Sequence, residues 1–191
     1  MTVGVEIRKV ILSEFLSFDG VAETPTDFIL EFNDEVMDEY GASVLSTLDT
    51  VILGRRTYDE WSAFWPDSDI EPFASFINNV PKFIFTSTPL ERSWMNTTVA
   101  DSPLREFVTS LKNEPGGDIG VTGSITLSQS LLAQGLVDEL RLVIAPTVMV
   151  NGRKLFDGTT PSRFEVTRNV TSRTGYLLVN LRFVEAPSST N

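Results

Sequence analysis

The sequence contains no cysteine and no histidine. Their absence excludes disulfide bonds, thiolate nucleophiles, imidazole bases and nearly every kind of zinc site. We therefore expect no bound metal, and chemistry that relies on carboxylates, hydroxyls, basic groups or a cofactor. No apolar run approaches the ~18 residues of a membrane span, and the N-terminus lacks a basic segment followed by a hydrophobic one. These features predict a cytoplasmic protein with no membrane contact.

Positive charge is also scarce. The 191 residues include 15 lysines and arginines against 26 aspartates and glutamates, which gives a formal net charge of −11. Such a surface repels a phosphate backbone, so a nucleic-acid partner is excluded and a small-molecule ligand is expected. Because the global charge is negative, an anionic ligand would need a concentrated local site of positive charge.

Strand patterns alternate with helix patterns along the chain, and the last two strands form a hairpin. The expected strands are 9–18, 50–53, a short one within 80–89, 97–100, 119–124, 139–146, 164–171 and 176–184. The expected helices are 32–48, one that begins just after Gly54, 103–112 and 126–134. This order predicts one α/β domain over residues 1–185, with a mixed, mostly parallel sheet, helices on both faces and an antiparallel C-terminal hairpin. Residues 186–191 have no apolar anchor and are expected to form a flexible tail.

A glycine stands at two junctions between a strand and a helix. These are Gly54-Arg55-Arg56-Thr57 and Gly123-Ser124-Ile125. Glycine lets a ligand approach the backbone, the helix start offers free N–H groups, and arginine supplies forked donors for phosphate. Two such junctions on adjacent strands would flank one crevice and could hold a dinucleotide diphosphate. The alternative is that both are simple turns, with solvated arginines at the first and Ser124 as a helix cap at the second.

The order of several motifs carries a family resemblance. They are Ser17-Phe18-Asp19-Gly20, Leu53-Gly54-Arg55-Arg56-Thr57-Tyr58-Asp59, Pro81-Lys82-Phe83-Ile84-Phe85-Thr86-Ser87, Gly123-Ser124-Ile125-Thr126-Leu127 and Gly152-Arg153-Lys154-Leu155-Phe156. Together they resemble the dihydrofolate-reductase-like family, in particular its riboflavin-biosynthesis reductase branch, the C-terminal domain of bifunctional deaminase-reductases. The resemblance runs from about Lys9 to Val184 and implies a three-layer dihydrofolate-reductase-like fold.

The resemblance also implies a reductase that takes hydride from NADPH. Gly54, Arg55 and Thr57 would then lie along the cofactor phosphates, and Gly123, Ser124 and Ile125 would cover the diphosphate. The turn Thr86-Ser87-Thr88, with Arg55 or Arg56, would meet the adenosine 2′-phosphate. Thr122 departs from the family pattern, since many relatives have a glycine there. The zinc ligands of the deaminase half are absent, so the chain resembles a stand-alone reductase domain. Family members often pair through sheet edges, so a homodimer is expected.

The sequence gives fewer indications of the residues that bind the substrate or donate a proton. The resemblance suggests a small heterocycle, such as 5-amino-6-(5-phosphoribosylamino)uracil or dihydrofolate. Asp19, after the first strand, and Asp34, on the first helix, are the candidate proton donors, although a turn role for Asp19 and a helix-start role for Asp34 are equally open. Trp65 could stack on the substrate, pack in the core or contact a second subunit of a dimer. A noncatalytic NADPH-binding module of the same fold is the alternative function.

Overall fold

A computed structural model describes residues 7–30 and 34–184. Within them, eight strands form one sheet in the order β4-β3-β2-β5-β1-β6-β8-β7. The strands are β1 (Val10–Leu16), β2 (Leu48–Gly54), β3 (Lys82–Phe85), β4 (Thr97–Val99), β5 (Asp118–Thr122), β6 (Glu139–Ile144), β7 (Phe164–Thr171) and β8 (Leu177–Phe183). The first six in chain order pair in parallel, whereas β8 is antiparallel to both β6 and β7.

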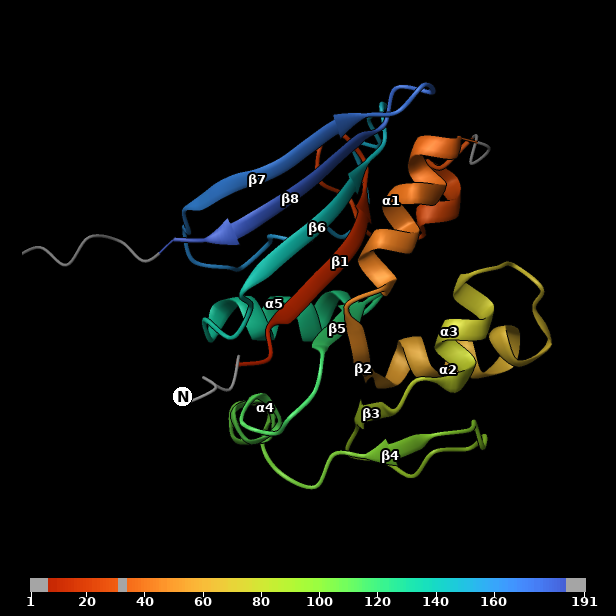
Figure 1. Cartoon of the computed structure of the whole chain (residues 1–191), viewed down its shortest axis with the longest axis vertical. Coiled ribbons are helices and arrows are strands. Elements are labelled where there is room, and N and C mark those ends of the chain that lie inside the picture. The colour runs from red at the N-terminus through yellow and green to blue at the C-terminus, as the bar shows by residue number, and fades with distance from the viewer. Residues whose placement is uncertain (1–6, 31–33, 185–191) are drawn as a thin grey trace, which may run out of the picture.

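Helices cover both faces of this sheet (Figure 1). They are α1 (Glu35–Leu45), α2 (Arg55–Phe64), α3 (Phe73–Asn79), α4 (Leu104–Lys112) and α5 (Ile125–Ala133). Helices α4 and α5 lie on one face, where leucines of α5 pack with Val10, Leu12 and Val121 in the largest apolar cluster. Helix α1 packs on the other face near β6 and β8, and α2 and α3 pack on the same side near β2 and β3.

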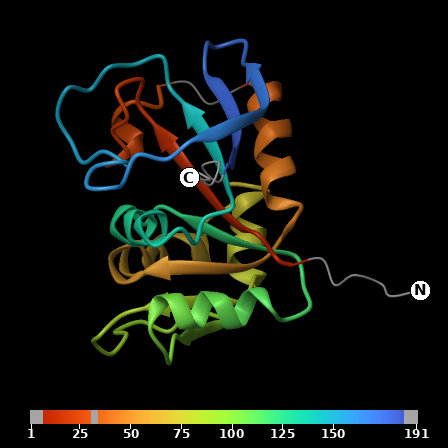
Figure 2. The same ribbon diagram turned by 90° about the vertical axis from the view of Figure 1, so that its left-hand side faces the viewer.

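The layers follow from the side-chain alternation of the strands. In β1, Val10, Leu12 and Leu16 belong to the α4 and α5 side, and Phe15 packs against the cluster under α1. Figure 2 shows α4 and α5 in front of the strands, with both helices running along the same face. Because β1 lies between β5 and β6, the carboxyl end of this central strand adjoins the turns that follow its neighbours.

The predicted α/β architecture with an antiparallel C-terminal hairpin is confirmed. All eight expected strands are present. Helix α3 was not predicted, because its seven residues are too short to display a helical period. The predicted tail 186–191 and the first residues of the predicted helix 32–48 lie outside the described residues. No helix in the described part of the chain is both long and apolar enough to cross a membrane.

Candidate cofactor site

The two glycine junctions lie against each other at the carboxyl ends of β2 and β5. Gly54 N–H donates to Ser124 Oγ at 2.9 Å, the Ser124 hydroxyl donates to Thr57 Oγ1 at 2.8 Å, and the Thr57 hydroxyl donates to the Gly123 carbonyl at 2.7 Å. Thr57 and Ser124 are buried. This relay of hydroxyls fixes the start of α2 relative to the start of α5, so the two helix N-termini lie side by side.

Gly123 has a backbone conformation that favours glycine, with φ at +66°. A Cβ atom there would lie 2.9 Å from Trp61 Cζ2 and 3.2 Å from Thr57 Cγ2. The turn is therefore packed closely against α2 and cannot accept a side chain without movement. Gly54 differs, because its φ of −81° suits any residue. A Cβ on Gly54 would make ordinary contacts with Ser124 Oγ at 3.4 Å, Ser124 Cβ at 3.6 Å and Leu127 Cβ at 3.8 Å.

We predict that replacing Thr57 with valine will damage the site. Valine keeps the shape of threonine but removes the hydroxyl that joins Ser124 to the Gly123 carbonyl. The loss of a buried hydroxyl with two partners is expected to lower the free energy of unfolding by about 1–3 kcal/mol and to weaken dinucleotide binding about tenfold. Chemical denaturation and calorimetric titration measure the two effects. Thr57→Ser, which keeps the hydroxyl, is the control, and equal affinities of the two variants would contradict the prediction.

The two arginines of the first junction have different surroundings. The Arg55 Nε donates to both carboxylate oxygens of Asp59, at 2.7 and 2.8 Å, and its Nη1 donates to Thr88 Oγ1 and to the Thr88 and Pro89 carbonyls. Arg55 therefore ties the first turn of α2 to the loop after β3. Arg56 has a side chain that is 71% exposed and pairs with Glu60 at 3.1 Å and Glu23 at 3.7 Å.

The predicted 2′-phosphate turn adjoins Arg55. Thr86 Oγ1 accepts from the Thr88 N–H at 3.1 Å and donates to the Thr88 carbonyl at 3.0 Å, which closes the turn around Ser87. Arg55 thus contacts Thr88, and Thr86 closes the turn that contains Ser87, whereas their binding of a 2′-phosphate stays a prediction. The Asp59 carboxylate shares the Arg55 guanidinium, so a bound phosphate would have to compete with it or use the remaining donor.

Two basic residues near the second junction were not predicted as site residues. The Arg153 Nη2 donates to Thr126 Oγ1 in the first turn of α5 at 2.8 Å, and the Arg153 N–H donates to Glu23 at 3.3 Å. Lys154 pairs with Asp19 at 3.7 Å. The motif Gly152-Arg153-Lys154 is visible in the sequence, but the residues around it do not show that this loop packs against α5.

Both candidate proton donors are ionised carboxylates that accept hydrogen bonds from other parts of the chain. Asp19 accepts from Ser17 Oγ and from the N–H groups of Met149 and Val150. The Met149 N–H and the Ser17 hydroxyl are the main causes that lower the pKa of Asp19 to about 2. Asp19 therefore holds the loop after β6 against the turn after β1, and at neutral pH it has no proton to donate.

Asp34 caps α1 and is buried. It accepts from the Val36 N–H at 3.0 Å and from the N–H and hydroxyl of Thr174 at 2.9 and 3.0 Å. Burial raises the pKa of Asp34, but these hydrogen bonds, with one from Ser172, outweigh it and lower the pKa to about 2. The geometry favours the helix-start role, and the carboxylate also holds the β7–β8 turn.

Trp65 lies in an aromatic group outside the relay. Its ring centroid is 6.0 Å from that of Trp61, 5.0 Å from that of Phe64 and 4.7 Å from that of Phe73. These edge-to-face contacts join the end of α2 to α3 and favour the core role of Trp65. Trp61, which contacts the Gly123 turn, is the tryptophan of this group that reaches the glycine junctions.

Sequence reasoning missed a third carboxyl group, that of Glu14. Glu14 is in β1 and only 6% exposed. Burial raises the pKa of Glu14 to about 8, and the N–H groups of Gly123 and Ser124 oppose this only in part. The Ser128 hydroxyl is 3.5 Å from Glu14 Oε1. The central strand thus places a carboxyl group beneath the second glycine turn.

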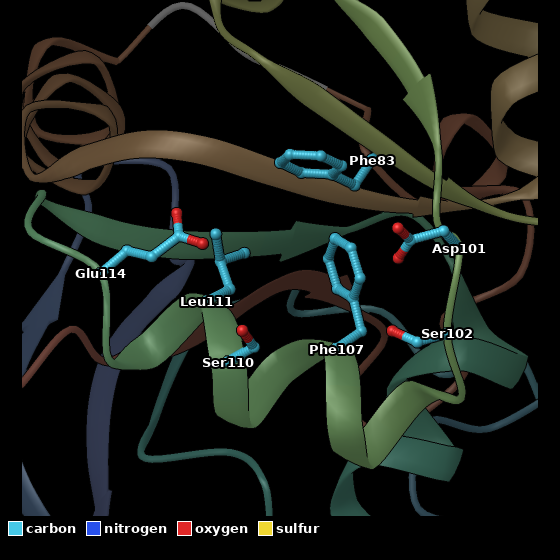
Figure 3. A pocket seen from close by; sticks show the side chains of 7 residues that line it. All are labelled: Phe83, Asp101, Ser102, Phe107, Ser110, Leu111 and Glu114. Atoms are coloured by element: carbon cyan, nitrogen blue, oxygen red, sulfur yellow. The ribbon is translucent and has the colours of Figure 1, made fainter.

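A pocket of 240 Å³ lies elsewhere, between α4 and β3 (Figure 3). It is lined by Phe83, Asp101, Ser102, Phe107, Ser110, Leu111 and Glu114. The lining contains two carboxylates and no basic side chain. Such a surface repels phosphates, so this pocket does not fit the diphosphate of a dinucleotide.

Comparison with known proteins decides the family. The sequence model described as the RibD C-terminal domain matches residues 8–184. This chain belongs to the RibD C-terminal domain family. The resemblance predicted from the motifs is thereby confirmed. The uncharacterized protein YyaP of Bacillus subtilis (strain 168) is 32% identical to this RibD C-terminal domain over 162 residues, which are 82% of this chain and 84% of YyaP.

Solved structures show that the RibD C-terminal domain has a dihydrofolate-reductase-like fold. Dihydrofolate reductase from Enterococcus faecalis, complexed with NADP(H), superposes with a TM-score of 0.64 at 14% identity, over 93% of this chain and 97% of that one. A diaminohydroxyphosphoribosylaminopyrimidine deaminase/5-amino-6-(5-phosphoribosylamino)uracil reductase from Thermotoga maritima gives a TM-score of 0.63 at 14% identity. That alignment covers 93% of this chain but 57% of the Thermotoga chain. At such identities the likeness establishes the fold alone.

Proposed function

We propose that this protein is an NADPH-dependent reductase of a small heterocyclic substrate. The observation that carries the proposal is the relay through Thr57 and Ser124, which joins two helix N-termini at the carboxyl edge of the sheet. Ligands of open α/β sheets bind at this edge, and two adjacent helix starts attract a diphosphate. Membership of a family of reductases supports the same function.

The residues present fit a nicotinamide dinucleotide. At Gly123 the space for a Cβ is already filled by Trp61 and Thr57, so the turn before α5 is held closely against α2. Gly123, Ser124 and Ile125 would hold the diphosphate, and Thr57 would keep their turn in place. Arg55, Arg56 and the turn Thr86-Ser87-Thr88 would meet the 2′-phosphate. When bound, the cofactor supplies hydride from C4 of its nicotinamide.

The remaining work of the protein is positioning and proton supply. The tethered carboxylates Asp19 and Asp34 hold the loops around the carboxyl end of β1 in a fixed arrangement, which favours a defined substrate orientation. Because the pKa of each is about 2, neither holds a proton at neutral pH. We infer that water supplies the proton for the reduction. The proposed substrate is a pyrimidine or pteridine heterocycle.

An alternative function is a noncatalytic NADPH-binding module. The hydrogen bonds that lower the pKa of Asp19 and of Asp34 to about 2 favour it, since neither of these two candidate acids then holds a proton at neutral pH. Loss of nicotinamide absorbance in the presence of aminopyrimidine or pterin substrates separates the two functions. Turnover supports the reductase, and tight NADPH binding without turnover of any of these substrates supports the module.

Cofactor discrimination tests the arginine assignment. We predict that Arg55→Ala together with Arg56→Ala will weaken NADPH binding at least about tenfold, because charge-assisted hydrogen bonds to the 2′-phosphate are lost. NADH lacks this phosphate, so its affinity should change little. Calorimetric titration of both nucleotides measures the difference. Arg105→Ala is the control, because Arg105 is exposed and bonds to the Gln134 carbonyl near the C-terminus of α5. Equal weakening of both nucleotides would exclude the assignment.

We also propose that the protein is a homodimer that pairs through the edge of its C-terminal hairpin. Strand β7 is an edge strand, and most of its residues are exposed, including Val166 at 53%. An unpaired edge offers backbone donors and acceptors to a second copy. Light scattering should give twice the mass of one chain, and Val166→Lys should shift the equilibrium toward monomer. A wild-type monomer at micromolar concentration would contradict the proposal.

A further inference from the structure

Glu14 is a buried acid that has no charged partner within residues 7–30 and 34–184. It lies on the face of β1 that packs under α5, among Leu12, Leu16 and other apolar residues of the largest cluster. A hydrophobic side chain would suit this face, since burying a carboxyl group is costly unless hydrogen bonds compensate. The compensating groups are the Ser128 hydroxyl and the N–H groups of Gly123 and Ser124. Glu14 therefore contacts the glycine turn from the core side.

No charged side chain of the described residues contributes to the environment of Glu14. Helix α5 contains no charged residue at all. In β5 the charged residue is Asp118, at the opposite end of the strand. In β6 the register partner of Glu14 is Leu142, whereas Arg141 pairs with Ser13, whose side chain points to the opposite face. On the flanking loops, Asp19 and Lys154 pair with each other.

The same turn would face the diphosphate on its outer side. The N–H groups of Gly123 and Ser124 are directed at Glu14, so the diphosphate would meet the positive end of α5, and two negative charges on opposite sides of one turn repel each other. A neutral Glu14 can still accept a hydrogen bond from the turn through its carbonyl oxygen, and it then leaves the helix terminus free for the phosphate.

We propose that Glu14 is a positioning residue of the dinucleotide site, which holds the Gly123–Ser124 turn from inside and favours phosphate binding only while it is protonated. This inference rests on the proposed function. Its consequence is that the protein takes up protons when it binds a dinucleotide in mildly alkaline solution, and that affinity falls as the pH rises. Because the pKa of Glu14 in the free protein is about 8, affinity for NADPH should fall about tenfold or more between pH 7 and pH 9.5.

The test is a calorimetric titration of the wild-type protein and of Glu14→Gln with NADPH at pH 7 and pH 9.5. Glutamine keeps the shape and the acceptor oxygen but cannot ionise, so this variant should bind with nearly the same affinity at both pH values. Lys82, whose pKa burial lowers to about 8, is present in both proteins, so the difference between the two profiles isolates Glu14. Parallel profiles would overturn the inference.

A second measurement needs no variant. Titration of the wild-type protein at pH 8, in two buffers with different ionisation enthalpies, gives the number of protons taken up with NADPH. About half a proton is expected at a pH equal to the pKa of Glu14. Binding with no proton uptake would overturn the role of Glu14 and leave the proposed function intact. No NADPH binding at pH 7 would overturn the proposed function, and the role of Glu14 with it.

Discussion

Replacing Gly123 with alanine is expected to abolish most dinucleotide binding. The added methyl group would lie 2.9 Å from Trp61 Cζ2 and 3.2 Å from Thr57 Cγ2, so the turn has to move. If the shift breaks two charge-assisted hydrogen bonds to the diphosphate, affinity for NADPH should fall about a hundredfold. Calorimetric titration of the folded variant measures this loss.

The chain contains a closely matched control, Gly135, just after the C-terminus of the same helix. Its φ of +63° is nearly that of Gly123, but a Cβ there would have no atom within 4 Å. Both alanine variants should therefore lose about 1–2 kcal/mol of unfolding free energy from the left-handed backbone. Only Gly123→Ala should lose NADPH binding. Equal binding by the two variants would show that the turn does not contact the ligand.

The second large effect concerns stability and pH. The pKa of Glu14 is about 8 in the folded protein and near the ordinary 4.5 in the unfolded chain. Between these values the folded state binds more protons than the unfolded state, so the free energy of unfolding falls as the pH rises and levels off above pH 8. Wild-type stability relative to Glu14→Gln should fall by about 1.4 kcal/mol for each pH unit across this window.

Urea denaturation from pH 5 to pH 8.5 tests this dependence. Other groups titrate too, so the quantity to follow is the difference between wild type and Glu14→Gln at each pH. Glu106→Gln is the matched control, because Glu106 is exposed on α4. The control should run parallel to wild type. If Glu14→Gln does so as well, Glu14 is ionised throughout, and the account of its burial is wrong.

The fold could be predicted from the sequence because its signals are local. Apolar runs that end in glycine define β2 and β5, and the period changes to helical directly after Gly54 and after Ser124. The paired glycine junctions could be predicted for the same reason. Their direct hydrogen bonds could not, since Thr57 and Ser124 are 67 positions apart and meet only when β2 and β5 pair.

The carboxyl groups show where sequence reasoning stops. Asp19 follows the first strand and Asp34 begins the first helix, but the states of both carboxyl groups depend on donors more than a hundred residues away, at Met149 and Thr174. Glu14 interrupts an apolar strand, and this interruption could have marked it as a residue of interest. A single polar residue in a strand usually faces solvent, and only the packing of α5 over β1 shows that Glu14 is buried.

The central claim is that the joined glycine turns bind a nicotinamide dinucleotide, and parallel calorimetric titrations with NADPH, NADH and flavin nucleotides at pH 7 test it most directly. The account predicts saturable binding of NADPH, weaker binding of NADH, and loss of both with Gly123→Ala but not with Gly135→Ala. The account would be contradicted if neither NADPH nor NADH bound. It would also be contradicted if a flavin nucleotide bound more tightly and Gly123→Ala left that binding unchanged.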